Sequence, residues 1–233
     1  MRVFRNGLQV LTGSAKSITA ATKADPVVIT SNSHGYSNGD EIYLDSVSGM
    51  TELNGRNYIV ANSTSNTYSL QDLFGNDIDS TSYTAYTSGG STDEIYQQTT
   101  PYAAADIFDL RFAQSADVMY FAHPSYAVRT LSRTDHNAWT FATPTINENT
   151  TPVLTSTDNY PSVVTFFEQR LVFAATNNNP QTLWFSKSAD YLNFHTGTAD
   201  NDALIYTIAS NKVNAIRYLS ATRILNIGTS GGK

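Results

Sequence analysis

Four histidines are the side chains of this chain best suited to binding a metal or moving a proton, and they lie far apart: His34, His123, His136 and His195. Zinc sites on helices use pairs spaced as His-x-x-x-His, and no two of these histidines have that spacing. His34 precedes a glycine and is expected in a turn, His123 ends an expected strand, and the other two lie in polar turns. We therefore predict no metal site and no cofactor.

Carboxylates that could form a catalytic pair are equally scarce. A glycosidase needs two carboxylates that face each other across the sugar, and Glu168, next to two phenylalanines, is a conceivable member of such a pair. Its neighbours favour a place in a strand instead. Asp200 and Asp202 could bind calcium through oxygen, although a solvated turn is the simpler interpretation. The sequence has no Gly-x-Ser-x-Gly motif to support a serine nucleophile, and we predict a protein that is not an enzyme.

Sparse charge and abundant small polar residues characterise the 233-residue chain. It has 14 Lys and Arg against 20 Asp and Glu, a net charge of −6, whereas Ser, Thr and Asn number 24, 30 and 20. A protein that holds duplex DNA by neutralising phosphates needs the opposite balance. With 14 Tyr and 11 Phe, the composition favours strands over long helices.

The sequence lacks cysteines, membrane-spanning runs and a secretory signal pattern, each of which would indicate a particular cellular compartment. The absence of cysteine excludes disulfides, thiolate metal sites and cysteine nucleophiles, and it fits a reducing cytoplasm or a particle assembled there. No apolar run reaches the roughly 20 residues that span a bilayer. The first residues have no secretory signal pattern, so we expect no membrane partner.

Short expected strands follow one another closely between residues 22 and 92. Expected strands at 27–29, at 41–44, where polar and apolar residues alternate, and at 57–61 are separated by turn formers, and Asn54-Gly55 favours a type I′ hairpin turn. Such spacing indicates a small self-contained β barrel or sandwich. We predict an N-terminal strand and linker over 1–21, and a small β-barrel-like module over 22–92 that is inserted near the start of the following domain.

A repeat of 52 to 53 residues follows the module. Its three copies are DVMYFAHP (117–124), QRLVFAAT (169–176) and TRILNIGT (222–229). Each copy is an apolar strand that ends in small residues or a turn, and a second strand with a polar turn follows the first two. A period near 50 residues is typical of β-propeller blades.

Residues 93–233 are therefore expected to form a propeller-type domain with about two blades and the start of a third. Closed propellers have at least about four blades. Either the chain is part of a longer protein or a partner completes its sheets, and we expect the first, with this chain as the front part. Two polar turns, SRTDHNAW (132–139) and more weakly SKSADYLNF (186–194), resemble the Asp box of sialidase-type propellers. In those enzymes the Asp box is a structural turn, so the resemblance implies a blade rather than a catalyst.

Two wider resemblances cover nearly the whole chain. The segments HGYSNGD (34–40), GMTELNGR (49–56) and YTAYTSGG (83–90) resemble a small β module of phage tail proteins that is similar to the FCCH domain of ubiquitin-activating enzymes. Thioester chemistry does not come with it, because the chain has no cysteine.

Later motifs resemble the tail nozzle protein of short-tailed phages, the tail tubular protein B type. They are TPY (100–102), LRFAQSAD (110–117), HP (123–124), LSR (131–133), YP (160–161), QRLVFA (169–174), PQTLWFS (180–186) and NDA (201–203). The resemblance implies a hexameric ring in the virion, assembled in the bacterial cytoplasm. It also implies that the ring binds an adaptor or portal-side tail protein and tail fibres or spikes, and that DNA passes through without specific binding.

The sequence and the resemblances together predict an all-β protein with a small β-barrel-like module inserted in an incomplete β-propeller-type domain. The predicted function is a structural component of a phage tail nozzle that forms part of the channel for genome ejection. The alternative is a propeller-like tail protein that binds or cleaves bacterial surface glycans. We expect the inserted module to contact partners through exposed turns around Tyr36, Met50 and Tyr86.

Overall fold

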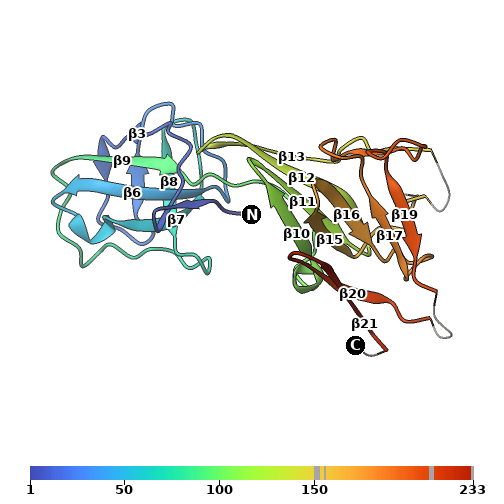
Figure 1. Cartoon of the computed structure of the whole chain (residues 1–233). Helices are drawn as coiled ribbons and strands as arrows, with labels where there is room; N and C mark the ends of the chain where they lie inside the picture. The colour runs from blue at the N-terminus through green and yellow to red at the C-terminus, as the bar shows by residue number, and fades with distance from the viewer. Residues whose placement is uncertain (150–152, 155, 210–212, 232–233) are drawn as a thin grey trace. The chain divides into compact units, whose positions relative to one another are not determined.

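The computed structural model describes residues 1–149, 153–154, 156–209 and 213–231, and these residues form an all-β protein (Figure 1). Their helical elements are two single-turn 3-10 helices, η1 (Thr51–Leu53) and η2 (Ile107–Asp109). No helix in the described ranges could cross a membrane. The chain divides into two compact units, Met1–Gln98 and Thr99–Lys233. The predicted all-β class is confirmed.

A seven-stranded antiparallel sheet with the order β3-β9-β6-β7-β8-β5-β4 makes up most of the first unit. Its strands are β3 (Lys16–Ser17), β4 (Ala20–Ala21), β5 (Val28–Thr30), β6 (Glu41–Ser48), β7 (Arg56–Ala61), β8 (Thr67–Gln71) and β9 (Ser88–Glu94). A hairpin of β1 (Phe4–Arg5) and β2 (Leu8–Gln9) precedes it. The sheet therefore takes in residues before position 22 and after position 92.

The two edges of this sheet are joined by only two residues. β3 and β4 lie at opposite ends of the strand order, yet Ile18 and Thr19 alone separate them. The Ile18 amide donates to the carbonyl of Gly90 in β9 (2.9 Å), and the Thr19 amide donates to the carbonyl of Thr30 in β5 (2.8 Å). Consecutive amides thus bond to opposite edges, so the sheet must curl into the predicted barrel-like shape.

Alternate side chains of the curled sheet fill its interior. The barrel core contains Ile42 and Leu44 from β6, Val60 from β7 and Leu70 from β8, all at most 1% exposed. β-Branched and aromatic residues suit such a half-buried pleated surface. The alternation of polar and apolar residues over 41–44 thus places Ile42 and Leu44 on the inner face.

Carboxylates tie the N-terminal segment to the barrel. Asp93 accepts hydrogen bonds from the Thr12 hydroxyl (2.8 Å) and from the amides of Gly13 and Ser14 (3.1 and 3.2 Å). The buried carboxylate of Glu41 pairs with Arg2. The segments that enter and leave the barrel consequently run side by side.

Two four-stranded antiparallel sheets and a hairpin form the second unit. The first sheet has β10 (Arg111–Ser115), β11 (Val118–His123), β12 (Tyr126–Asp135) and β13 (Ala138–Ala142). The second has β15 (Val163–Phe167), β16 (Arg170–Ala174), β17 (Thr182–Phe185) and β19 (Leu204–Thr207). The hairpin is β20 (Ile216–Ala221) with β21 (Leu225–Thr229), and a short parallel pair joins β14 (Asn147–Glu148) to β18 (Asn193–Phe194).

The repeat predicted from the sequence is confirmed by the strand register. Arg111 pairs with Ala122 in the first sheet, and Val163 pairs with Ala174 at the equivalent place in the second. The leading strands are neighbours in space, because β10 contacts β15 and β15 contacts β20. Repeated four-stranded antiparallel sheets are the units from which β-propellers are built.

The interface between the two sheets is apolar and aromatic. Trp184 and Phe173 of the second sheet are at most 1% exposed and pack in one cluster with Tyr120 and Val128 of the first. The sheets are thus held by core packing of the kind that also holds blades together.

Glu168 lies in a turn, which corrects the expectation that it belongs to a strand. Glu168 and Gln169 connect β15 to β16 and have φ values of +45° and +60°. Two successive positive φ values match a type I′ hairpin turn. The sequence suggested a continuous strand because neither residue is one of the Asn or Gly types that signal this turn.

We expect the substitution Gly49→Ala to destabilise the barrel. Gly49 has φ +89°, and a Cβ atom there would overlap the carbonyl oxygen of Ala85 and lie 2.8 Å from the Thr87 amide nitrogen. Left-handed strain and overpacking together should lower the free energy of unfolding by about 3 kcal/mol. Urea unfolding followed by far-UV circular dichroism measures the change.

Gly39→Ala is the matched control for this substitution. Gly39 has nearly the same φ, +93°, but nothing lies within 4 Å of the added Cβ. We expect a loss of about 1 kcal/mol, from backbone strain alone. If both variants lose the same free energy of unfolding, the close packing of residues 85–87 on Gly49 contributes nothing to the effect of Gly49→Ala.

Candidate interaction site

The three side chains predicted to contact a partner belong to the barrel core or pack against it. Met50 is completely buried and Tyr36 is 7% exposed, while Tyr86 is half-buried against the same cluster. The Tyr86 hydroxyl donates to the carbonyls of Ile18 (3.1 Å) and Gly89 (3.0 Å). The expectation that these turns expose them is wrong, because the turns fold over the barrel and their large side chains point inward.

A buried polar network surrounds Tyr36. Its hydroxyl donates to the carbonyl oxygen of Thr92 (3.0 Å), and the Tyr68 hydroxyl lies 3.0 Å from Oγ1 of Thr92. Burial raises the pKa of Tyr36 to about 12, and it raises the pKa of Tyr68 further. Both phenols are therefore neutral, and their hydrogen bonds to Thr92 hold β9 to the interior of the barrel.

Two histidines close tight turns, as expected for His34. Nδ1 of His34 accepts the Tyr36 amide (3.0 Å), and Nδ1 of His123 accepts the Ser125 amide (3.0 Å). Both rings are at most 3% exposed. In the described part of the chain, no group of three or more His, Asp or Glu residues is placed to hold a metal ion.

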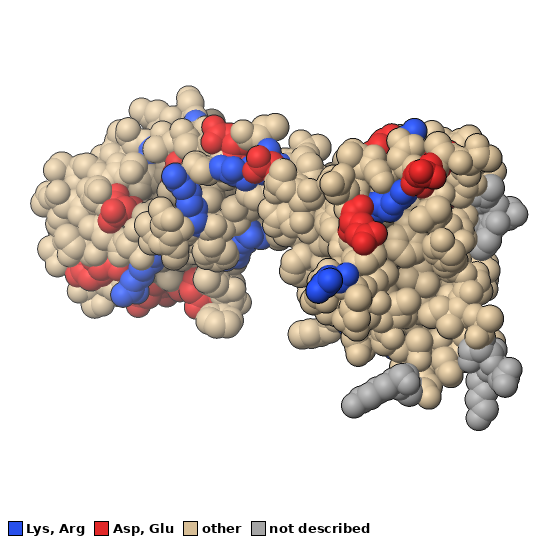
Figure 2. All heavy atoms as spheres, viewed as in Figure 1, with Lys and Arg blue, Asp and Glu red and all other residues tan. Residues whose placement is uncertain are grey.

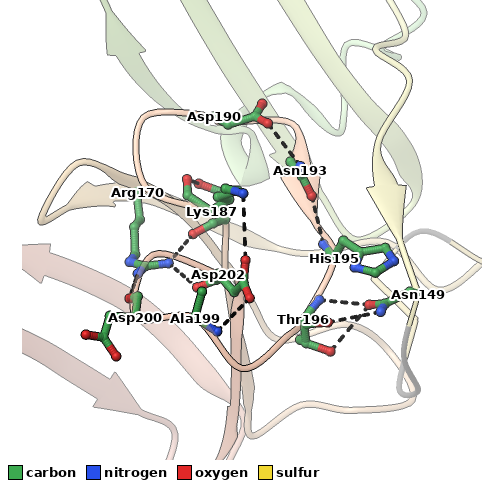
Figure 3. Close-up of polar contacts among 11 residues, drawn as sticks. Asn149, Arg170, Lys187, Asp190, Asn193, His195, Thr196, Ala199, Asp200 and Asp202 are labelled. Atoms are coloured by element: carbon green, nitrogen blue, oxygen red, sulfur yellow. Dashed lines mark hydrogen bonds and ion pairs between the residues drawn. The ribbon is translucent and has the colours of Figure 1, made fainter.

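Arg170 organises the polar cluster drawn in Figure 3. Its guanidinium donates to the carbonyls of Ser186 (2.7 Å), Asp202 (2.6 Å) and Asp200 (3.0 Å), and the residue is 8% exposed. Oδ1 of Asp202 lies 3.7 Å from Nζ of Lys187. The backbone carbonyls of Asp200 and Asp202 are thus engaged by Arg170, and the Asp202 carboxylate lies beside Lys187. The cluster fastens the loop before β19 to β16.

The segment that weakly resembled an Asp box forms a compact turn in the same cluster. Asp190 accepts a hydrogen bond from the Asn193 side chain (3.0 Å), and Asn193 in turn accepts the His195 amide (3.1 Å), as Figure 3 shows. Phe194 is buried beneath the turn and packs on Phe173 with ring centroids 5.8 Å apart. These contacts give the segment a structural role in the second sheet.

Charged side chains cover a small part of the face shown in Figure 2, and exposed apolar side chains offer more distinctive surface. In the first unit the most exposed of these are Phe74 (91%), Leu8 (73%) and Phe4 (64%). Large exposed aromatic side chains of this kind commonly anchor protein interfaces. They form two features, a tip and a pocket.

The tip is the turn over residues 72–76. Asp72 accepts the amides of Phe74 (2.8 Å) and Asn76 (2.9 Å) through Oδ1, and the Asn76 side chain (2.9 Å) through Oδ2. These bonds, those from Asn76 first, hold the pKa of Asp72 below its usual range. The turn therefore leaves Leu73 and Phe74 exposed, at 48% and 91%.

The pocket lies beside the β1–β2 hairpin and has a volume of about 350 Å³. Phe4, Leu8 and Leu11 form apolar parts of its lining, and Gln9 and Asn57 contribute amides. These amides bond to each other reciprocally, at 2.6 and 2.7 Å. The sequence analysis missed both features, although Asp72 with Gly75-Asn76 is a turn signal that puts two apolar residues at a tip.

Residues 25–95 match the FCCH domain of ubiquitin-activating enzyme E1. The part of the resemblance that concerns the module is therefore confirmed, and its matched segment coincides with most of the barrel. No cysteine is present for the chemistry of that enzyme. No curated protein matches the chain.

A solved structure with some similarity is the endosialidase of phage phi92. It is 14% identical, the match covers 88% of this chain and 32% of that one, and the TM-score is 0.25. The chain thus spans about a third of the length of that protein. This similarity is too small to carry a functional inference.

Thr92→Val should destabilise the barrel by leaving the Tyr68 hydroxyl buried without its partner. Among the described residues Tyr68 has no other hydrogen-bond partner, and its side chain is fully buried. We expect a loss of about 1 to 3 kcal/mol in urea unfolding. Tyr68→Phe should lower the free energy of unfolding less in the Thr92→Val variant than in the wild type. If the two losses of free energy are additive, the hydrogen bond between Tyr68 and Thr92 does not contribute to stability.

Arg170→Met should destabilise the second unit, because three carbonyls lose a charged donor. We expect a loss of about 3 kcal/mol or more, and a smaller one for Arg170→Lys, which keeps the charge but not the fork of donors. Tryptophan fluorescence reports on this unit, since both tryptophans, Trp139 and Trp184, lie in it. Arg223→Met, at an exposed position, is the control and should change stability by at most about 0.5 kcal/mol.

Proposed function

We propose that the protein is a structural subunit of a phage tail nozzle, which forms part of the channel for genome ejection and binds neighbouring tail subunits. The observation that carries this proposal is the succession of blade-like sheets that meet through β10, β15 and β20. Such an arrangement supplies a rigid scaffold, and the FCCH-like barrel adds a second folded unit to it.

The residues behind the nozzle resemblance have structural positions, which supports a scaffold. Arg170 and Ser186 belong to the cluster that fastens β16, and the Pro180 carbonyl accepts the Ile216 amide (2.9 Å) at the start of the next hairpin. The motif segment at Pro180 therefore connects the second repeat to the third.

The charge balance supports a conduit. Every Lys or Arg that faces the channel would add a salt-dependent contact with DNA phosphates and slow the passage of the genome. A chain with a net charge of −6 and 74 Ser, Thr and Asn residues offers few such contacts. On this proposal the surface that lines the channel is uncharged or acidic.

Antibodies against the chain are expected to label the tail of virions of the phage that encodes it, as seen by immunogold electron microscopy. The same antibodies should inhibit DNA release from those virions. Antibody first adsorbed on the purified chain is the control. Virions without label would overturn the proposal, and so would release of reducing sugars from bacterial surface polysaccharide by the purified chain.

A further inference from the structure

The first unit carries a protruding aromatic tip and an apolar pocket of its own. Phe74 at the tip is 91% exposed, and the pocket is bounded by Phe4 and Leu8, which are 64% and 73% exposed. An isolated molecule keeps both surfaces in water, and burying them against each other would remove a large apolar area from solvent.

The tip is organised for insertion before any partner binds. The Asp72 carboxylate bonds to two amides and one side chain within the turn, and the Gly75 amide donates to the Asp72 carbonyl (3.1 Å). A turn fixed in this way loses little conformational freedom when Phe74 becomes buried. Rigid aromatic side chains of this kind are typical interface anchors.

The pocket has the dimensions and chemistry to receive an aromatic side chain. Its volume of about 350 Å³ lies at the small end of the range of binding pockets. Phe4, Leu8 and Leu11 give it apolar walls, and Tyr43 offers a ring for edge-to-face contact. None of the side chains that line it is charged.

The surface charges beside the two features are of opposite sign, whereas Asp93, which pairs with Tyr43 of the pocket, is buried. Asp72, Asp77 and Asp79 belong to the tip and the chain that follows it, and no Lys or Arg occurs between Arg56 and Arg111. Arg5 follows Phe4 in the hairpin, and Arg56 precedes the pocket residue Asn57; both arginines are exposed. A tip facing another tip would repel, whereas a tip facing the pocket would be attracted.

We propose that the 72–76 tip of one copy inserts Phe74 into the Phe4–Leu8–Tyr43 pocket of a second copy. This contact joins unlike surfaces, so it is heterologous, and repetition of it generates a ring when the rotation between copies closes. The inference rests on the proposed function in one respect, because a nozzle subunit is the context that calls for such a ring.

Cysteine cross-linking tests the contact directly, since the chain has no cysteine of its own. Leu73→Cys and Leu8→Cys change two exposed side chains and keep Phe74, so both variants should fold and associate. Oxidation of an equimolar mixture of the two should give a disulfide-linked dimer of one Leu73→Cys and one Leu8→Cys chain. Thr81→Cys mixed with Leu8→Cys is the control, because Thr81 is exposed in the same acidic stretch but lies outside the tip.

Sedimentation of the full chain gives a second measurement. Phe74→Ser should weaken self-association at least about tenfold, as expected for removal of an interface anchor. Arg56→Glu should weaken it, and adding Asp77→Lys should restore it in part by exchanging the two charges. Phe108→Ser, which removes an equally exposed phenylalanine of the second unit, should leave self-association unchanged.

The outcomes separate this inference from the proposed function. Rings of the complete gene product without cross-linking above the Thr81→Cys control would overturn the contact and leave the nozzle proposal standing. Efficient cross-linking of Leu73→Cys to itself would also overturn it, because it indicates a contact between like surfaces. If the cross-linking is specific but antibodies against the chain do not label virions, the contact between copies stands and the nozzle proposal is rejected.

Discussion

Closure of the barrel by two consecutive amides is the constraint on which the first unit depends. Ile18 and Thr19 donate to β9 and β5, which lie near opposite edges of the sheet, and the Ile18 side chain enters the core. A flat seven-stranded sheet could not satisfy both bonds across a two-residue link. The curl then gives every strand an inner face, and it brings the segments that enter and leave the barrel together at Asp93.

This closure also decides which side chains are left for contact with partners. The turns at the barrel ends must cover the core, so Tyr36 and Met50 serve packing although their sequence neighbours are turn formers. Contact surface remains where the chain departs from the barrel, in the β1–β2 hairpin and the Asp72 turn. The apolar residues exposed there are the ones that packing does not need.

Regular pairing could be predicted from the sequence, whereas the direction of turn side chains could not. The 52-residue spacing predicted equivalent strands in two sheets. The prediction is correct because the pattern of apolar residues sets the register of a strand pair, and this pattern recurs. The type I′ turn predicted at Asn54-Gly55 is wrong, because Asn54 has φ −70° and only Gly55 has a positive φ, +72°. Turn chemistry shows where a chain reverses, here between β6 and β7, but the curvature of a whole sheet decides whether Met50 or Tyr86 points inward. The turn at Glu168 was not predicted, because the positive φ of this residue is imposed by the two strands that it joins.

The hydrogen bonds explain the abundance of Ser, Thr and Asn in the chain. Short side chains hold backbone in place throughout: Asn54 bonds to both the amide and the carbonyl of Val47 at 2.8 Å, and Ser80 bonds to the backbone of Ala24. Such bonds rigidify loops without adding charge. A surface built this way exerts a weak electric field, so specific association must come from shape and from a few local charges. A rigid aromatic tip opposite an uncharged pocket, with arginines near one and aspartates near the other, meets that requirement.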